Sequence, residues 1–149
     1  MRLLLTLSFV TACFFNAIQA TPKTFDTYLQ SITPLDSREL TQLVSGNSII
    51  GKTHHTDSMY ELYFDPSGKL YFRKNHSEKE TYIGKWWVKD GNIYSQWPTY
   101  NNGATNQIKY YPIIDNAFLY KTINSDGSET TYEKPFLLFP GNIFNITDS

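Results

Sequence analysis

Cysteine is almost absent from this chain, and the one cysteine present lies near the N-terminus. Cys13 falls within an apolar stretch, and residues 21–149 contain no cysteine. Residues 21–149 therefore cannot form an internal disulfide, and they offer no thiol nucleophile. A chain of that length can bury enough apolar surface to fold without disulfides. We therefore expect an ordinary hydrophobic core.

Long runs of one charge sign are also missing. The chain holds 13 Lys and Arg against 14 Asp and Glu, a net charge of −1, and neither sign gathers in one stretch. A protein that binds nucleic acid or anionic lipid through charge needs a basic patch. The sequence therefore predicts no nucleic acid partner and no polybasic membrane-binding face.

The linear motifs of common enzymes do not occur. The chain has no Gly-x-Ser-x-Gly, no His-Glu-x-x-His and no glycine-rich phosphate loop. We expect no catalytic residue and no cofactor. A hydrolase acting on an envelope or host polymer stays an alternative, because paired carboxylates can meet in space without a linear signature.

Histidine is scarce, and its placement argues against a metal site. Acidic residues lie near the three histidines in the sequence: His54, His55 and His76, with Asp57, Glu78 and Glu80. Adjacent residues of a strand point to opposite faces, so His54 and His55 cannot both bind one ion without a bulge. We predict no metal ligands.

The N-terminus, in contrast, carries a clear export pattern. A basic start at Arg2 is followed by the apolar run from Leu3 to Phe15, and Ile18-Gln19-Ala20 then precedes Thr21. These are the parts of a secretory signal peptide, and the run is too short for a membrane span. We predict a signal peptide over residues 1–20, cleavage after Ala20 and a periplasmic or secreted protein.

A lipid anchor is the alternative use of this segment. Val10-Thr11-Ala12-Cys13 fits a bacterial lipobox, in which cleavage leaves Cys13 as a lipidated N-terminus. A protein processed in that way would be attached to a membrane surface.

In residues 21–47 the apolar residues recur with the spacing of an α-helix, and we predict that this segment is a helical preface, that is, a helical part that precedes the strands. Residues 24–32 place apolar side chains on one face, and so does a second segment, in which Leu40, Leu43 and Val44 form the apolar stripe. Asp36 or Ser37 suits the N-cap of the second helix, with Glu39 at capping-box spacing from Asp36. Gly46-Asn47 supplies a left-handed stop.

From Ser48 onward apolar residues recur at every second position, and residues typical of tight turns separate these segments. The strongest are Asp90-Gly91 and Asp65-Pro66-Ser67-Gly68. Strands are predicted over residues 48–52, 59–64, 70–74, 81–89, 92–97, 107–114, 117–123, 128–133 and 135–139. Short connections imply an antiparallel meander, and a meander of about eight strands curls or closes to hide its edges. We predict one all-β domain over residues 21–149, with a barrel or strongly curled sheet over residues 48–149.

Alternation along the predicted strand 81–89 assigns its faces. Trp86 and Val88 should face the core, and Gly84 on the same face leaves room for a bulky neighbour. Trp87 lies between two lysines and should be partly exposed.

Aromatic residues are the best functional lead. With 11 Tyr, 10 Phe and 3 Trp, the chain has more aromatic rings than a small closed meander can bury. Trp87, together with Trp97 and Tyr100 at the start of the Asn-rich loop 97–106, is predicted to contact a ligand. The leading hypothesis is a non-catalytic binding module whose aromatic-lined barrel mouth or face holds a small ligand, a glycan or a protein. An envelope assembly or structural factor is a further alternative.

Four short motifs occur in a fixed order along the chain. They are Leu43-Val44-Ser45-Gly46-Asn47-Ser48, Tyr63-Phe64-Asp65-Pro66-Ser67-Gly68, Gly84-Lys85-Trp86-Trp87-Val88 and Gly91-Asn92-Ile93-Tyr94-Ser95-Gln96-Trp97. In this order they resemble a group of small exported bacterial proteins of unknown function, over roughly residues 36–141. The resemblance implies a periplasmic or secreted β domain and supplies no catalytic residues. The Gly-x-Trp strand also resembles that of lipocalins, as an analogy of fold only.

Overall fold

The computed structural model describes residues 25–53, 58–75, 81–99 and 101–146. Two short helices, α1 (Phe25–Leu29) and α2 (Ser37–Val44), precede the strands. The strands are β1 (Asn47–Lys52), β2 (Met59–Phe64), β3 (Lys69–Lys74), β4 (Thr81–Lys89), β5 (Asn92–Gln96), β6 (Thr105–Ile114), β7 (Ala117–Ile123) and β8 (Glu129–Pro140), with a 3-10 turn at Asn101–Gly103. Of the helices in the described part of the chain, none has the length and apolarity needed to cross a bilayer.

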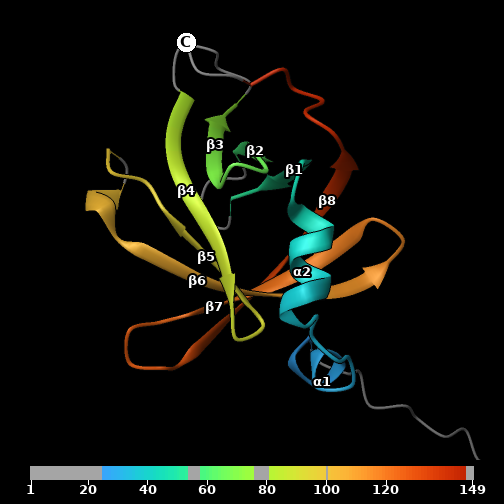
Figure 1. Ribbon diagram of the computed structural model, residues 1–149. Coiled ribbons are helices and arrows are strands. Elements are labelled where there is room, and N and C mark those ends of the chain that lie inside the picture. Colours follow the sequence, from blue (N-terminus) through green and yellow to red (C-terminus); the bar gives the residue numbers. More distant parts are fainter. Residues whose placement is uncertain (1–24, 54–57, 76–80, 100, 147–149) are drawn as a thin grey trace, which may run out of the picture.

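The eight strands form a closed antiparallel barrel (Figure 1). Each strand pairs with the next in sequence, and β8 closes the ring on β1, with Ser48 opposite Phe139. The tight turns explain this order. Asp90 and Gly91 both have positive φ, 50° and 68°, as a two-residue hairpin turn between β4 and β5 requires. The predicted all-β barrel is confirmed.

The last two predicted strands are one strand in the structure. Phe118 of β7 lies opposite Phe136, and Tyr120 lies opposite Tyr132, so two steps along β7 match four along β8. The extra residues form a bulge that contains Pro135, where no ladder hydrogen bond is required of its nitrogen. The sequence prediction of a break near Pro135 was wrong for this reason.

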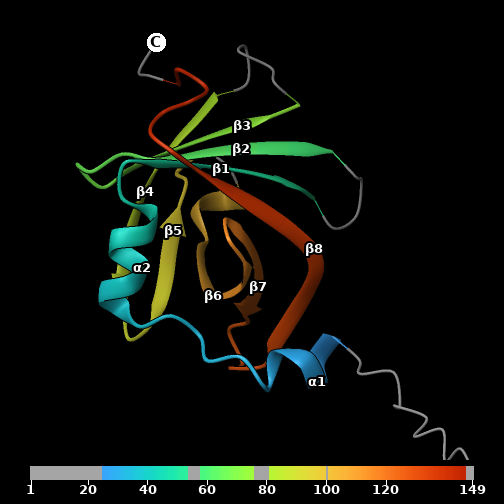
Figure 2. The same ribbon diagram turned by 90° about the vertical axis from the view of Figure 1, so that its right-hand side faces the viewer.

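Two strands, β4 and β8, bend so that one part of each pairs with one neighbouring strand and the other part pairs with the strand on its other side. Residues 81–85 of β4 pair with β3, whereas residues 85–89 pair with β5, and Gly84 lies at the change. Likewise β8 pairs with β7 up to Leu137 and with β1 from Leu137 onward. Figure 2 shows the result, with β1–β3 as one layer and β5–β7 as the layer facing it.

The core fills the barrel and extends under α2. Phe64, Ile93 and Phe136 are buried inside the barrel, and Leu40 and Val44 of α2 join the same cluster with no exposed surface. The predicted capping box holds the start of α2. The Glu39 amide donates to Asp36 Oδ1 (2.8 Å), and the Asp36 amide donates to Glu39 Oε2 (2.9 Å). Helix α2 therefore covers one end of the barrel, which we call the α2 end.

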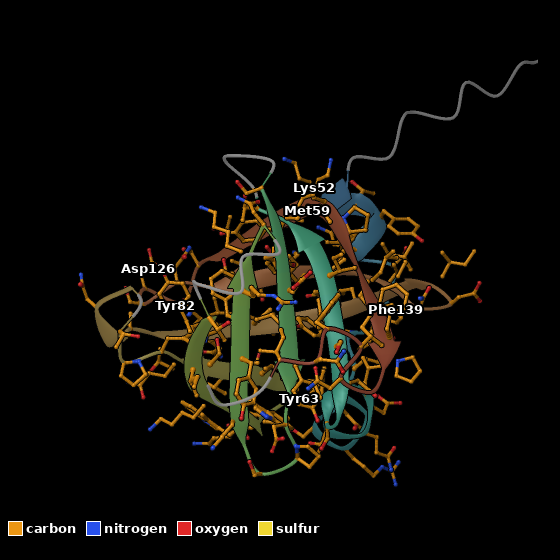
Figure 3. All side chains as sticks on the ribbon, turned by 90° about the horizontal axis from the view of Figure 1, so that it is seen from above. Lys52, Met59, Tyr63, Tyr82, Asp126 and Phe139 are labelled. Atoms are coloured by element: carbon orange, nitrogen blue, oxygen red, sulfur yellow. The ribbon has the colours of Figure 1, made fainter. Side chains whose placement is uncertain are left out.

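The opposite end, called here the far end, carries the connections after β1, β3, β5 and β7. Figure 3 shows the two ends along the β1–β2 pair, with Lys52 and Met59 side by side at the far end and Tyr63 toward the α2 end. His54, His55, His76, Asp57, Glu78 and Glu80 lie outside the described residues. Cys13, Ala20 and Tyr100 also lie outside them.

The outer surface of β1–β3 is covered by residues 141–146, called here the C-terminal strap. Ser48 Oγ donates to the Gly141 carbonyl (2.7 Å), Arg73 Nη2 donates to the Phe144 carbonyl (3.3 Å), and Ile146 is buried. Glu61 faces away from the core, as alternation predicts, but it has no exposed surface and its Oε2 accepts from Arg73 Nε at 2.6 Å. The outward face of β2 and β3 therefore holds a buried ion pair.

Candidate functional site

Four tyrosines lie on the inner face of the barrel and are only half-buried. They come from β2, β4, β7 and β8: Tyr60, Tyr82, Tyr120 and Tyr132. The strand register places each of them on the side that carries the buried core residues. Tyr60 and Tyr82 lie near the far end, where β2 and β4 begin. We call this set the inner tyrosines.

Tyr60 reaches across the barrel from one layer to the other. Its ring lies over Gly51, where an added Cβ would be 2.5 Å from the Tyr60 hydroxyl oxygen. The Tyr60 hydroxyl donates a hydrogen bond to the Tyr120 hydroxyl on β7. Glycine at position 51 is therefore required for this crossing, because any larger residue would displace the ring.

The hydroxyls of Tyr60 and Tyr120 stay protonated at neutral pH. Burial raises the pKa of Tyr120 to about 12, with Tyr132 adding to the shift. Burial also holds the pKa of Tyr60 well above its ordinary value and raises that of Tyr110, deeper in the barrel. The far end thus offers neutral hydroxyl groups that can donate and accept hydrogen bonds.

Aromatic contacts line both walls around these hydroxyls. Tyr120 and Tyr132 are stacked, with ring centroids 4.6 Å apart and planes 11° from parallel. On the other wall, Phe72 packs against Tyr82 at 5.7 Å and against Trp97 at 5.9 Å. Flat apolar surfaces and a few hydroxyls therefore face one another inside the barrel.

Sequence reasoning missed Ser95, which lies on the same inner face of the barrel. It is 2% exposed, on the inner face between Trp86 and Asn106, and its Oγ has no hydrogen-bond partner within the described chain. Burying a hydroxyl without a partner costs about 1–3 kcal/mol, so such a group is a natural contact for a bound polar atom. The alternation of Ile93, Ser95 and Trp97 was the signal that could have identified it.

Two of the predicted ligand residues, Trp87 and Trp97, do not lie in one site. Trp97 is only 8% exposed and belongs to the core. An added Cβ on Gly84 would lie 2.6 Å from the Trp97 ring, so the glycine admits a bulky neighbour, as the sequence predicts. Trp87 is 36% exposed and lies on the outer face of β4, on the other side of the sheet from Trp97. Tyr100 lies outside the described residues.

The outer face around Trp87 is a second feature of interest. The Trp87 ring stacks on Tyr94 of β5, with centroids 5.4 Å apart and planes 7° from parallel. Lys85 Nζ lies over the same indole ring, 5.7 Å from its centroid. An aromatic pair and a cation thus stand together on an exposed part of the barrel wall.

Carboxyl groups are placed away from the interior. No inner-face position that the strand register assigns in the described strands is Asp or Glu. The described part of the chain also contains no group of three or more His, Cys, Asp or Glu side chains able to hold a metal ion. The inner-face positions of the described strands therefore offer stacking and hydroxyl hydrogen bonds, and they also include Lys74, the Cα partner of Tyr60 at the far end.

No protein-family model, curated protein or solved structure matches this chain. The resemblance to small exported bacterial proteins accordingly stays a prediction.

Proposed function

We propose that this protein is an exported, non-catalytic binding module that holds a small ligand against the inner tyrosines at the far end of the barrel. The observation that carries the proposal is the placement of half-buried tyrosines, with neutral hydroxyls, on the inner face of a barrel whose other end is covered by α2. Ligand sites in proteins are mostly apolar, with a few placed polar groups. Eight-stranded barrels are wide enough to hold one small ligand.

The chemistry of these residues indicates the ligand class. The rings of Tyr82 and Tyr132 offer flat apolar contacts, and the hydroxyls of Tyr60, Tyr120 and Ser95 offer hydrogen bonds without a charge. A flat, mainly apolar molecule with one or two polar atoms fits this set best. Export is supported by the basic start, apolar run and small cleavage residue of residues 1–20.

Native mass spectrometry of the protein purified from its own envelope or culture medium tests both parts. We expect a mature chain that begins at Thr21 and a bound mass that is released on denaturation. Because Trp97 packs beside Phe72, which contacts Tyr82, removal of that ligand should change tryptophan fluorescence. An acylated N-terminal Cys13 would contradict the proposed processing.

Variants separate binding at the far end from binding elsewhere. Tyr82→Ala should lose the bound mass, whereas Tyr94→Ala, which removes a tyrosine from the outer face of the barrel, should retain it. Both variants are checked for folding by circular dichroism. Loss of the bound mass in Tyr94→Ala alone, or its retention in both variants, would overturn the proposed site.

A further inference from the structure

A lysine lies on the inner face of the barrel beside the inner tyrosines. Lys74 of β3 is the direct Cα partner of Tyr60, and it follows Phe72 on the face that carries the core. Phe72 is in turn the Cα partner of Tyr82, so Lys74 lies diagonally across from Tyr82 at the far end. The Lys74 side chain is half-buried. The site proposed above therefore includes a cationic residue at its rim.

The Lys74 ammonium makes no hydrogen bond or ion pair in the described part of the chain. On the neighbouring strand β2, Glu61 lies on the outer face and is bonded to Arg73. At the far end, Glu129 accepts a hydrogen bond from Lys109. A half-buried cation on an inner face to which the strand register assigns no carboxylate is a natural contact for a negative group of a bound molecule.

Two other charged side chains of the far end are engaged within the protein. Lys134 Nζ donates to the Thr53 carbonyl (3.3 Å), just beyond the end of β1. Asp126 Oδ1 accepts from the Ser128 amide (2.9 Å) in the turn between β7 and β8, where its side chain is exposed. Lys74 is therefore the inner-face cation that a bound anion would contact.

Ser95 adds an uncharged polar contact deeper in the barrel. Its Cα partner on β4 is Trp86, four residues past Tyr82 toward the α2 end. The Ser95 side chain is buried, and its Oγ has no hydrogen-bond partner within the described chain. The inner face thus presents a cation at the rim and a neutral hydroxyl further in, and the Tyr82 ring lies on the strand between them.

We propose that the ligand of the inner tyrosines is a flat monocarboxylate, whose carboxylate pairs with Lys74 at the rim and whose ring lies against Tyr82. This inference rests on the proposed function and adds the charge of the ligand. A carboxylate at the rim keeps contact with water while its apolar ring leaves water, and with an ammonium it forms a charge-assisted hydrogen bond. A single negative charge fits best, because the register assigns no second Lys or Arg to the inner face of the described strands.

Isothermal titration of the purified protein at neutral pH with three naphthalene probes tests the charge. The probes are 2-naphthoate, neutral 2-naphthamide and the cation 2-naphthylmethylammonium. We expect the naphthoate to bind at least about tenfold more tightly than the amide, and the cation to bind most weakly. In Lys74→Met, which keeps the aliphatic stem, the naphthoate should bind no more tightly than the amide. Lys52→Met is the matched control: Lys52 is exposed at the far end, on the outer face, and its removal should leave the preference for naphthoate unchanged.

The outcomes separate this inference from the proposed function. Equal binding of naphthoate and amide, an unchanged preference in Lys74→Met, or an equal loss of preference in Lys52→Met would each overturn the inference. The inner site would still stand if Tyr82→Ala abolished the binding of both probes. Absence of binding by all three probes would also overturn the inference, whereas the proposed function is decided by the bound mass of the native protein. Circular dichroism of each variant checks that it is folded.

Discussion

The buried ion pair beneath the C-terminal strap allows a sharp test of how this fold is held together. Glu61 has no exposed side-chain surface, Arg73 has 11%, and Arg73 Nε lies 2.6 Å from Glu61 Oε2. The substitution Arg73→Met keeps most of the aliphatic stem but leaves the Glu61 carboxylate buried without its cation. Removing one partner of a buried pair costs about 3–5 kcal/mol. We therefore expect Arg73→Met to lose a large part of a total stability of about 5–15 kcal/mol.

The double variant Glu61→Leu/Arg73→Met separates the penalty of a lone charge from the value of the pair. Replacing both charges with apolar groups of similar size is often neutral or stabilising, so the double variant should unfold at nearly the same urea concentration as the unchanged protein. The exposed pair of Lys109 and Glu129, 2.7 Å apart, is the control. Lys109→Met should cost about 1 kcal/mol or less. Urea unfolding followed by circular dichroism measures all three. If Arg73→Met costs no more than Lys109→Met, the reasoning is refuted.

Two further predictions concern the interior. The substitution Gly84→Ala should lower the free energy of unfolding by about 1–3 kcal/mol. The added Cβ would lie 2.4 Å from the Gln96 carbonyl oxygen and 2.6 Å from the Trp97 ring. If the variant unfolds at the same urea concentration as the unchanged protein, the packing around Gly84 is loose. Burial raises the pKa of Tyr120 in the folded state to about 12. The stability that the neutral Tyr120 hydroxyl contributes should therefore be fully present below about pH 10, where tyrosines of the unfolded chain begin to ionise, and should be lost as the pH rises toward 12. Urea midpoints between these pH values should depend less on pH in Tyr120→Phe, and an unchanged dependence would count against a buried Tyr120.

The strands could be predicted from the sequence because period-two alternation and turn residues act locally. Asp90-Gly91 and Asp65-Pro66-Ser67-Gly68 determine where two hairpins turn, whatever the rest of the chain does. The bulge at Pro135 could not be predicted in the same way. A proline within a strand looks like a break unless the register of the neighbouring strand is known.

The covered ion pair lay beyond sequence reasoning for a different reason. The alternation of β2 puts Glu61 on the opposite face from Tyr60 and Leu62, but alternation says nothing of what covers that face. The C-terminal strap that covers Glu61 shows no regular spacing of apolar residues that would predict its position. Its contacts join residues far apart in the sequence, as from Arg73 to Phe144. Burial on an outer face depends on such distant contacts.

The candidate site was partly within reach. The exposure of Trp87 followed from alternation between lysines, and its stacking partner Tyr94 lies directly opposite on the hairpin. Trp97 was assigned to the loop because it begins the Asn-rich segment 97–106, yet alternation from Ile93 continues through Trp97 into the core. Which inner tyrosines remain half-buried depends on how all eight strands close, and that is decided by the assembled barrel.

The pairing of the first strand with the last has a consequence for the order in which the chain acquires its structure. Ser48 and Gly141 meet although they are 93 positions apart, and the N-terminal partner becomes available first as the chain emerges. The strands β1 to β7 can form hairpins in turn, but the ring stays open until β8 has emerged. Such long-range closure is slow compared with local pairing. The outward charges of Glu61 and Arg73 remain hydrated during that interval, because the strap that buries them follows β8 in the chain.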